Sequence, residues 1–228
     1  MSRRERLGIL GGTFDPIHLG HLRAAESVRE AMALDRVLFV PARVPPHKAR
    51  PSIAAAEHRF RMVEAAVRTE PAFEVSRLEL EREGASYTIE TLAELAQSRP
   101  DTELFFITGI DAFRDIRTWK CWEELLRSYS FIVHGRPGYG LAGVGEVIPS
   151  SVRKRLVELR NNALPPLKGS TPADEAPTPA IYLVDVLTIN VSGTEIRAMV
   201  RANRSIRFLV PAEVEVYIMK HRLYREGP

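Results

Sequence analysis

The sequence predicts an α/β protein of the Rossmann-like, doubly wound type, with a parallel sheet that helices cover on both faces. Short apolar runs typical of buried strands alternate with segments of helical periodicity along the chain. Because strands buried on both faces need no polar alternation, these runs favour a parallel sheet over an antiparallel one. At 228 residues, the chain fits a single domain over 1–228, with a long flexible loop at about 139–180 and a small helical part at the C-terminus.

The composition narrows the class of protein. The chain is 45% hydrophobic and 27% charged, which is ordinary for a globular protein. No stretch approaches the ~18 consecutive apolar residues of a membrane span, and the first residues lack a signal-peptide pattern, so we expect a cytoplasmic protein with no membrane partner. The net charge of +3 suits small anionic substrates and falls short of a nucleic-acid-binding stripe. The single cysteine, Cys121, excludes an internal disulfide, and its burial as a small hydrophobe is favoured over catalysis.

The spacing of apolar residues, and the turn residues between them, predict the elements in order. Strands are expected at 7–10, 35–41, 73–80, 101–108, 129–133 and 181–186. Helices are expected at 19–33, 54–69, 86–97 (capped by Ser86 or Thr88), 119–127, 151–161, from 192, and 211–223. Prolines between 165 and 179 predict that the second part of 139–180 is a surface loop.

The turn after the first strand is the strongest candidate site. Gly11 and Gly12 lack a Cβ, so the backbone can bend sharply there and a ligand can approach it closely. Thr13 follows near the positive end of the next helix, where backbone N–H groups bind anions. His18 and His21 are three residues apart, so they project toward the same place if the helix begins by His18. Two imidazoles, a hydroxyl and a helix start, with no acidic cluster, indicate a pocket for phosphate groups.

Less specific readings exist for each part of this stretch. A Gly-Gly turn occurs in many α/β proteins, and a single histidine on a helix is usually structural or solvated. A zinc site would need a third ligand beside His18 and His21, and no cysteine lies near, so we expect no protein metal site. Gly20, between the two histidines, leaves room for a bulky group.

Other polar segments also follow expected strands, at 45–48, 109–111 and 192–197. Ligands of an open parallel sheet bind beyond the carboxyl ends of the strands, where the strand order reverses. These segments can therefore converge with the first turn. For 45–48, which contains Lys48, a solvated loop is favoured on spacing alone.

The segment 192–197 forms a second helix start. Ser192 and Thr194 supply hydroxyl groups, and Arg197 lies on the same side as Thr194 with a guanidinium that can hold two phosphate oxygens. An ordinary N-cap followed by a solvated arginine fits the same residues equally well. The residues alone leave both readings open.

The combination of these motifs resembles the HxGH nucleotidyltransferase superfamily. The first motif reads Gly11-Gly12-Thr13-Phe14-Asp15-Pro16, followed by His18-x-Gly20-His21. In this form it is similar to the bacterial nicotinate mononucleotide adenylyltransferase family. The resemblance spans nearly the whole chain and leaves only 139–180 without a counterpart. It implies a fold of the nucleotidyltransferase type.

The resemblance also implies a reaction: transfer of AMP from ATP to nicotinate mononucleotide, with release of pyrophosphate and formation of nicotinate adenine dinucleotide, in NAD biosynthesis. His18 and His21 would bind ATP phosphates, with His21 at the α-phosphate, while Thr13 steadies them. Lys48 and Arg197 would screen phosphate charge, and Mg²⁺ would bridge phosphate oxygens with few protein ligands. The other residues implied to bind ATP or its phosphates are Gly11, Gly12, Phe14, Gly109, Asp111, Ser192 and Thr194.

The middle of the chain is implied to recognise the acceptor. Backbone amides around Tyr87 and Thr88 would bind the nicotinate carboxylate, and Trp119 would stack on the pyridine ring or else pack in the core. Three positions depart from the family pattern: Glu90 replaces an aspartate, Val191 replaces an isoleucine, and Gly193 replaces a serine, so a hydroxyl is missing beside Ser192.

Three rival functions remain. A related adenylyltransferase could use nicotinamide mononucleotide or phosphopantetheine, although Tyr87, Thr88 and Trp119 favour nicotinate. A non-catalytic regulatory module would be expected to have lost His18, His21 or Arg197, and a nucleic-acid-binding protein would carry more positive charge. The sequence leaves the oligomeric state open, a homo-oligomer included.

Overall fold

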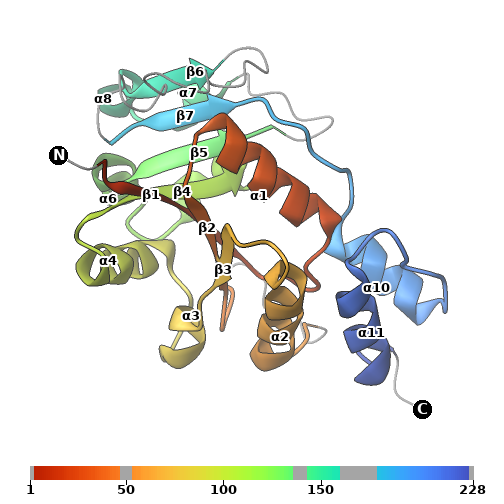
Figure 1. The fold of residues 1–228 in the computed structure, drawn as a ribbon. Helices are drawn as coiled ribbons and strands as arrows, with labels where there is room; N and C mark the ends of the chain where they lie inside the picture. Colours follow the sequence, from red (N-terminus) through yellow and green to blue (C-terminus); the bar gives the residue numbers. More distant parts are fainter. Residues whose placement is uncertain (1–2, 47–52, 136–142, 160–178, 226–228) are drawn as a thin grey trace.

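The computed structural model describes residues 3–46, 53–135, 143–159 and 179–225 (Figure 1). These residues form a seven-stranded sheet in the order β3-β2-β1-β4-β5-β7-β6, and every neighbouring pair of strands is parallel. The strands are β1 (Glu5–Gly12), β2 (Arg36–Pro41), β3 (Phe73–Val75), β4 (Thr102–Gly109), β5 (Ser130–His134), β6 (Leu156–Leu159) and β7 (Ile181–Val184). This order confirms the predicted doubly wound sheet, whose order reverses between β1 and β4.

Helices connect the strands and cover the sheet. They are α1 (Leu19–Ala31), α2 (Ala56–Val67), α3 (Leu78–Glu81), α4 (Thr88–Ser98), α5 (Ile110–Arg114), the 3-10 helix η1 (Ile116–Thr118), α6 (Trp122–Ser128), α7 (Val144–Val147), α8 (Ser150–Arg153), α10 (Gly193–Arg201) and α11 (Ala212–Lys220). Figure 1 shows α10 and α11 at the end of the chain beside α2 and the start of α1, which confirms the predicted C-terminal helical part.

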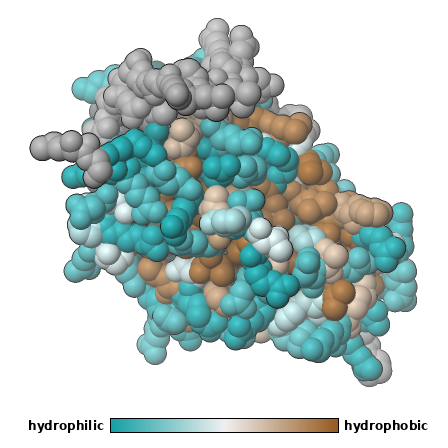
Figure 2. Space-filling model, viewed as in Figure 1, coloured by the Kyte–Doolittle hydropathy of each residue, from teal (hydrophilic) through white to brown (hydrophobic). Residues whose placement is uncertain are grey.

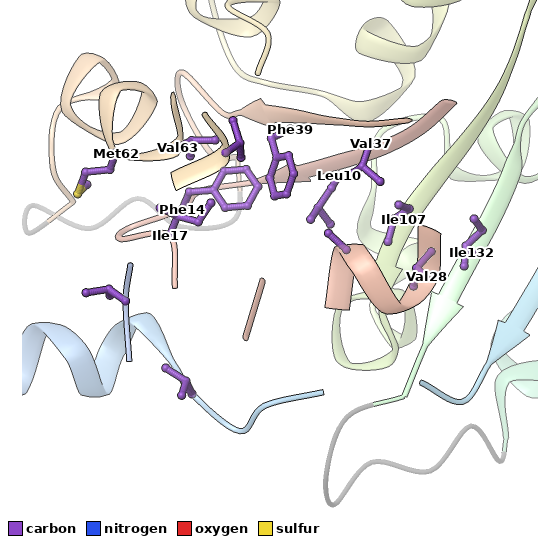
Figure 3. Packing of buried hydrophobic residues seen from close by; sticks show 14 of the residues in the cluster. Leu10, Phe14, Ile17, Val28, Val37, Phe39, Met62, Val63, Ile107 and Ile132 are labelled. Carbon is purple, nitrogen blue, oxygen red and sulfur yellow. The ribbon is translucent and has the colours of Figure 1, made fainter. Parts of the chain in front are cut away.

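The central strand β1 is buried on both faces. Leu7 and Ile9 are fully buried in one hydrophobic cluster, which includes side chains of α4, α5 and α6. Leu10 points to the opposite face, where it joins Phe39, Ile107 and side chains of α1, α2, α10 and α11 (Figure 3). Since successive strand residues point to opposite faces, this uninterrupted apolar run is what a two-sided sheet requires.

The surface is mainly hydrophilic in the view of Figure 2, and hydrophobic residues gather toward the side where α1 and the segment from β7 to α10 lie. On that segment, Leu187 is 69% exposed and Ile189 is 42% exposed. Among the described residues, no helix combines the length and apolar character needed to cross a membrane.

The expected strand at 73–80 is wrong in its second half. β3 ends at Val75, and Leu78–Glu81 forms the short helix α3. The Ser76 N–H still donates to the Phe39 carbonyl of β2 at 2.9 Å, but the Ser76 hydroxyl accepts from the Leu78 N–H at 3.2 Å, and the chain turns into the helix there. The shift in apolar alternation near Leu78 thus marks a helical turn.

The region 139–180 contains regular structure that the sequence did not indicate. Instead of a helix at 151–161, α8 ends at Arg153 and the edge strand β6 follows, with Leu156 paired to Ile181 of β7. The predicted long loop is therefore wrong for 144–159, which holds α7, α8 and β6. The proline-rich part, at 160–178, lies outside the described residues.

Two smaller expectations are also wrong. The helix expected from Trp119 begins only at Trp122, because Cys121 before it has a left-handed backbone with φ of 52° and is exposed instead of buried. At the start of α4, the capping position is Tyr87, since the Ser86 hydroxyl accepts instead from the Arg43 N–H at 2.9 Å.

Candidate active site

A cavity of about 380 Å³ lies at the carboxyl ends of β1, β4 and β5, where the strand order reverses. Its lining includes every predicted phosphate-site residue that the structure describes: Gly11, Gly12, Thr13, Phe14, His18, His21, Gly109, Asp111, Ser192, Thr194 and Arg197. Ligands of open α/β sheets bind at this position. Lys48 belongs to 47–52, outside the described residues. The structure thus brings together the motifs after β1 and β4 with the start of α10.

Gly11 and Gly12 belong to the end of β1 instead of forming the turn. They pair with Val40 and Pro41, and the chain turns only at Thr13. A Cβ on Gly12 would lie 3.0 Å from the Phe14 ring, so glycine lets this ring fold back over the strand end. Phe14 itself has a left-handed backbone, with φ of 48°.

Phe14 borders the cavity with its backbone while its ring is part of the core. The side chain is 2% exposed, and its ring packs against Phe39 at 5.9 Å between centroids (Figure 3). It also meets the edge of the His21 ring at 5.2 Å. Phe14 therefore anchors the turn and supports His21.

His18 and His21 lie together, as the spacing predicted. His18 is the N-cap of α1 and His21 is in its first turn, with the two rings stacked at 3.6 Å between centroids. The backbone N–H of His18 donates to Nδ1 of the His21 ring at 3.3 Å. Because Nδ1 accepts, a neutral His21 carries its proton on Nε2, where it can donate to a phosphate oxygen.

A side chain at Gly20 would collide with a neighbouring segment of the chain. A Cβ at Gly20 would lie 2.9 Å from the Ile189 carbonyl oxygen and 3.0 Å from Nδ1 of His18. Gly20 therefore lets the segment after β7 pass directly over α1. Gly20 also lies in the cavity lining, between His18 and His21, so open space does adjoin this residue.

The start of α10 is a capping box. The Ser192 hydroxyl accepts from the Glu195 N–H at 3.2 Å, and Glu195 accepts from the Ser192 N–H at 3.2 Å. A Cβ at Gly193 would lie 2.7 Å from the Asp15 carbonyl oxygen. The glycine that departs from the family pattern thus lets α10 contact the turn after β1.

Arg197 is held at the cavity wall by two neighbours. Its Nη1 donates to the Asp15 carbonyl at 2.5 Å and lies 3.5 Å from Oδ2 of the Asp15 carboxylate. Its Nη2 donates to the Thr194 hydroxyl at 3.2 Å. Of the two readings left open, the solvated arginine is wrong, because the side chain is only 13% exposed.

Arg59 of α2 is a residue that the sequence analysis missed. It is 1% exposed, and its guanidinium donates to the carbonyls of Thr13 at 2.7 Å, Ala54 at 2.9 Å and Arg43 at 3.1 Å. Burial lowers the pKa of Arg59, with the nearby Asp15 charge opposing this effect. Arg59 thus ties together the backbones that follow β1 and β2.

His134 is a second missed residue. It ends β5, is 7% exposed and lines the cavity. Its Nδ1 lies 3.0 Å from the Gly135 carbonyl, so this nitrogen is the donor. The sequence could have indicated His134, because it is a polar residue at the carboxyl end of a predicted buried strand.

Tyr87, Thr88 and Trp119 lie outside the cavity lining and gather, with Lys120, in a separate group at the start of α4, here named the α4 cluster. Lys120 Nζ lies 4.4 Å from the Tyr87 ring centroid and donates to Glu90 at 2.6 Å. Glu90, another departure from the family pattern, thus has a structural partner.

Phe106 of β4 links the α4 cluster to the cavity. The Trp119 ring meets it edge-on at 5.9 Å between centroids, and a Cβ at Gly11 would lie 3.4 Å from the same Phe106 ring. One aromatic side chain therefore separates Trp119 from the end of β1.

In the described part of the chain, no three histidine, cysteine, aspartate or glutamate side chains form a group able to hold a metal ion. The carboxylates that line the cavity there belong to Asp15 and Asp111. That of Asp15 already accepts hydrogen bonds from Ala54 and Tyr224.

Comparison with known proteins shows to which family the chain belongs. Residues 9–199 match the model of the cytidylyltransferase-like family. A probable nicotinate-nucleotide adenylyltransferase from Thermus thermophilus is 45% identical over 96% of this chain and 100% of its own length. The chain belongs to the nicotinate-nucleotide adenylyltransferase family. Another adenylyltransferase of the family, from Thermoanaerobacter, is 41% identical over 99% of this chain and 97% of its own length.

Solved structures agree on the fold. The Plasmodium falciparum nicotinic acid mononucleotide adenylyltransferase complexed with NaAD has a TM-score of 0.70 at 20% identity, over 96% of this chain and 97% of that one. A putative nicotinate-nucleotide adenylyltransferase from Vibrio parahaemolyticus has a TM-score of 0.62 at 17% identity, over 98% of this chain and 97% of that one. The nucleotidyltransferase type of the α/β fold is thereby confirmed.

Proposed function

We propose that this adenylyltransferase transfers the AMP unit of ATP to nicotinate mononucleotide. The observation that carries the proposal is the cavity at the strand-order reversal, which holds His18, His21 and Arg197 together in a chain of this family. An oxygen of the acceptor phosphate attacks the α-phosphorus of ATP, and the bond from that phosphorus to the leaving oxygen breaks. The products are nicotinate adenine dinucleotide and pyrophosphate, which assigns the enzyme to NAD biosynthesis.

The attacking phosphate is already an anion, so the reaction needs no general base. Catalysis consists of aligning two anions and stabilising the charge that develops on the α-phosphate and on pyrophosphate. His21, as a donor through Nε2, serves the α-phosphate, while His18 and Arg197 serve the remaining phosphates. The N–H and hydroxyl groups of Thr13 and of the α10 start add further donors.

The acceptor specificity is assigned to the α4 cluster. Backbone N–H groups at Tyr87 and Thr88, at the start of α4, suit a carboxylate, and the half-buried Trp119 suits a flat pyridine ring. The assignment is supported by the Phe106 ring, which contacts Trp119 on one side and lies close to Gly11 of the cavity lining on the other. Gly109 and Asp111 are assigned to the adenosine ribose.

Mg²⁺ is proposed as the metal, bound mainly through ATP phosphate oxygens. The cavity lining fits this role, because its described carboxylates are only those of Asp15 and Asp111, and the Asp15 carboxylate already accepts hydrogen bonds from protein groups. The ion would supply positive charge to the phosphates. Lys48, from outside the described residues, is proposed to add further positive charge there.

We treat 1–228 as one nucleotidyltransferase domain, because β1 and α10 from opposite ends of the chain line the same cavity. Since ATP is the proposed substrate, the cytoplasm is the proposed location. A homo-oligomer stays a prediction.

The test is pyrophosphate release by the purified protein with ATP and Mg²⁺. Nicotinate mononucleotide, nicotinamide mononucleotide and phosphopantetheine are compared as acceptors, with His21→Ala as the inactive control. The proposal is supported if pyrophosphate is released with nicotinate mononucleotide and not with the other two acceptors. Equal turnover with the amide would contradict the assigned role of Tyr87 and Thr88, and no turnover with any acceptor from folded protein would contradict the reaction itself.

A further inference from the structure

Asp15 occupies a buried junction between three parts of the chain. The residue is 7% exposed and lies in the turn between β1 and α1. Its Oδ1 accepts from the Tyr224 hydroxyl at 2.7 Å and from the Ala54 N–H at 3.1 Å. Its backbone carbonyl and Oδ2 face Arg197. The carboxylate thus joins the segment after α11, the segment before α2 and the guanidinium at the cavity wall.

The two interactions between Asp15 and Arg197 are unequal. Nη1 of Arg197 is 2.5 Å from the Asp15 carbonyl oxygen, which is a full hydrogen bond, but 3.5 Å from Oδ2. With side-chain exposures of 13% for Arg197 and 4% for Asp15, solvent screens this pair weakly. The carboxylate is therefore close enough to compete for the guanidinium, yet it does not form a bidentate pair with it.

Tyr224 provides the competing donor. It lies beyond the end of α11, in a left-handed backbone conformation with φ of 63°. Burial and the Asp15 charge raise the pKa of Tyr224 well above its ordinary value, so the phenol is protonated at neutral pH. A protonated phenol hydroxyl is a permanent donor to a carboxylate.

We propose that Tyr224 is a positioning residue for the reaction: by binding Oδ1 of Asp15, it keeps the carboxylate from pairing fully with Arg197 and leaves the guanidinium available to phosphate. This inference rests on the proposed function, since it needs Arg197 to act on ATP phosphates. Without the hydroxyl, Oδ1 keeps only the longer hydrogen bond from the Ala54 N–H, and Arg197, 3.5 Å from Oδ2, is the cation that can replace the lost donor. A bidentate pair would then withdraw positive charge from the cavity.

The variant Tyr224→Phe removes only the hydroxyl. We expect kcat/KM for ATP to fall about tenfold, since hydrogen bonds to charged groups are among the stronger ones, while KM for nicotinate mononucleotide stays unchanged. Tyr217→Phe is the matched control, because the Tyr217 hydroxyl on α11 contacts His58 at 3.0 Å and lies outside the cavity lining. It should leave both constants unchanged.

A double-mutant cycle with Arg197→Lys separates positioning from a general structural role. If Tyr224 acts through Arg197, Tyr224→Phe has little further effect on kcat/KM for ATP once Arg197 has been replaced. The affinity for pyrophosphate gives a second readout that needs no turnover, measured by calorimetry well below the melting temperature of each variant. Tyr224→Phe should weaken this affinity when Arg197 is present and have little effect when Arg197 has been replaced.

Coupling of the two substitutions in both readouts supports the proposal. The proposal would be overturned if the loss in the double variant equalled the product of the losses in the two single variants, or if the Tyr224→Phe enzyme equalled the wild type. Either of those results with an active wild-type enzyme leaves the proposed function intact. Absence of turnover in the wild type would instead contradict the proposed function.

Discussion

The cavity and the α4 cluster differ in how the chain builds them. The cavity is assembled from both ends of the sequence, with β1 and α1 on one side and α10 on the other, and buried contacts to Asp15 and Arg59 hold its parts together. The α4 cluster is built from segments in the middle of the chain, and its ion pair between Lys120 and Glu90 is exposed. The proposed phosphate site is thus held together by buried contacts, whereas the proposed acceptor site carries an exposed ion pair.

This difference has a physical basis. Stabilising charge on transferring phosphates requires donors that are already in place, whereas a pyridine ring can be bound by a half-buried aromatic side chain such as Trp119. Changes in the cavity should therefore affect the reaction with any acceptor, and changes in the α4 cluster should affect the choice of acceptor. The following substitutions test that division.

The largest effect is expected for His21→Ala, which removes the proposed donor to the α-phosphate. We expect kcat to fall by about 10²–10³-fold, the usual loss for a preorganised donor to developing charge. Pyrophosphate release under saturating substrates measures it. His58→Ala, on α2 outside the cavity lining, should keep wild-type kcat, and a similar loss there would contradict the assignment.

Arg59→Met tests how much the hydrogen bonds of the buried Arg59 guanidinium contribute to the stability of the protein. The substitution leaves three loop carbonyls without their donor, and we expect the free energy of unfolding to fall by about 3 kcal/mol in urea titrations. Arg61→Met, on the same helix with an exposed side chain, should change it by less than about 0.5 kcal/mol. Equal losses would show that Arg59 has no special role.

Gly193→Ser supplies the hydroxyl that the family pattern has at this position. The Cβ would lie 2.7 Å from the Asp15 carbonyl, so α10 must move away from the turn after β1. Overpacking at a backbone contact typically costs about 1–3 kcal/mol. If about 1.4 kcal/mol of this cost is lost from the binding of ATP in the transition state, kcat/KM for ATP falls about tenfold. Restored or increased activity would contradict the close packing described for α10.

The smallest effect concerns Glu79, which lies beneath the α4 cluster, is 6% exposed and accepts from the Thr91 hydroxyl of α4 at 2.5 Å. Burial raises the pKa of Glu79 above its ordinary value. Between the ordinary pKa of the unfolded chain and the raised pKa of the folded protein, the folded state keeps a proton that the unfolded chain has lost. The free energy of unfolding should therefore decrease as pH rises through this window.

Unfolding measured across that window tests the Glu79 account. Glu79→Gln should weaken this pH dependence, whereas Glu81→Gln, an exposed carboxylate on the same short helix α3, should retain it. Identical pH profiles for wild type and Glu79→Gln would show that the burial of Glu79 does not affect its titration.

The sequence predicted what local patterns determine. The corner between β1 and α1, with His18 and His21 on one side, follows from a buried strand, two glycines and helical spacing. The convergence of this corner with Arg197 followed from the position of each motif after a strand of a parallel sheet. By contrast, β6 is a four-residue edge strand that exists through its pairing with β7, so its own pattern was ambiguous.

The contacts that hold the cavity together could not be predicted in the same way. Arg59 binds the Thr13 carbonyl 46 positions away, and Tyr224 binds Asp15 209 positions away. No periodicity connects such residues, and a buried arginine on an amphipathic helix looks like any surface arginine in the sequence. The distance of Tyr87 and Trp119 from the cavity lining likewise depends on how α4 and α6 pack.

The division between the cavity and the α4 cluster is tested most directly by the affinity for ATP without acceptor, measured by calorimetry for wild type, Arg197→Ala and Trp119→Ala. We expect Arg197→Ala to weaken ATP binding by at least about tenfold, through loss of a charge-assisted contact to phosphate, and Trp119→Ala to leave it unchanged. Equal weakening by both substitutions would contradict the account.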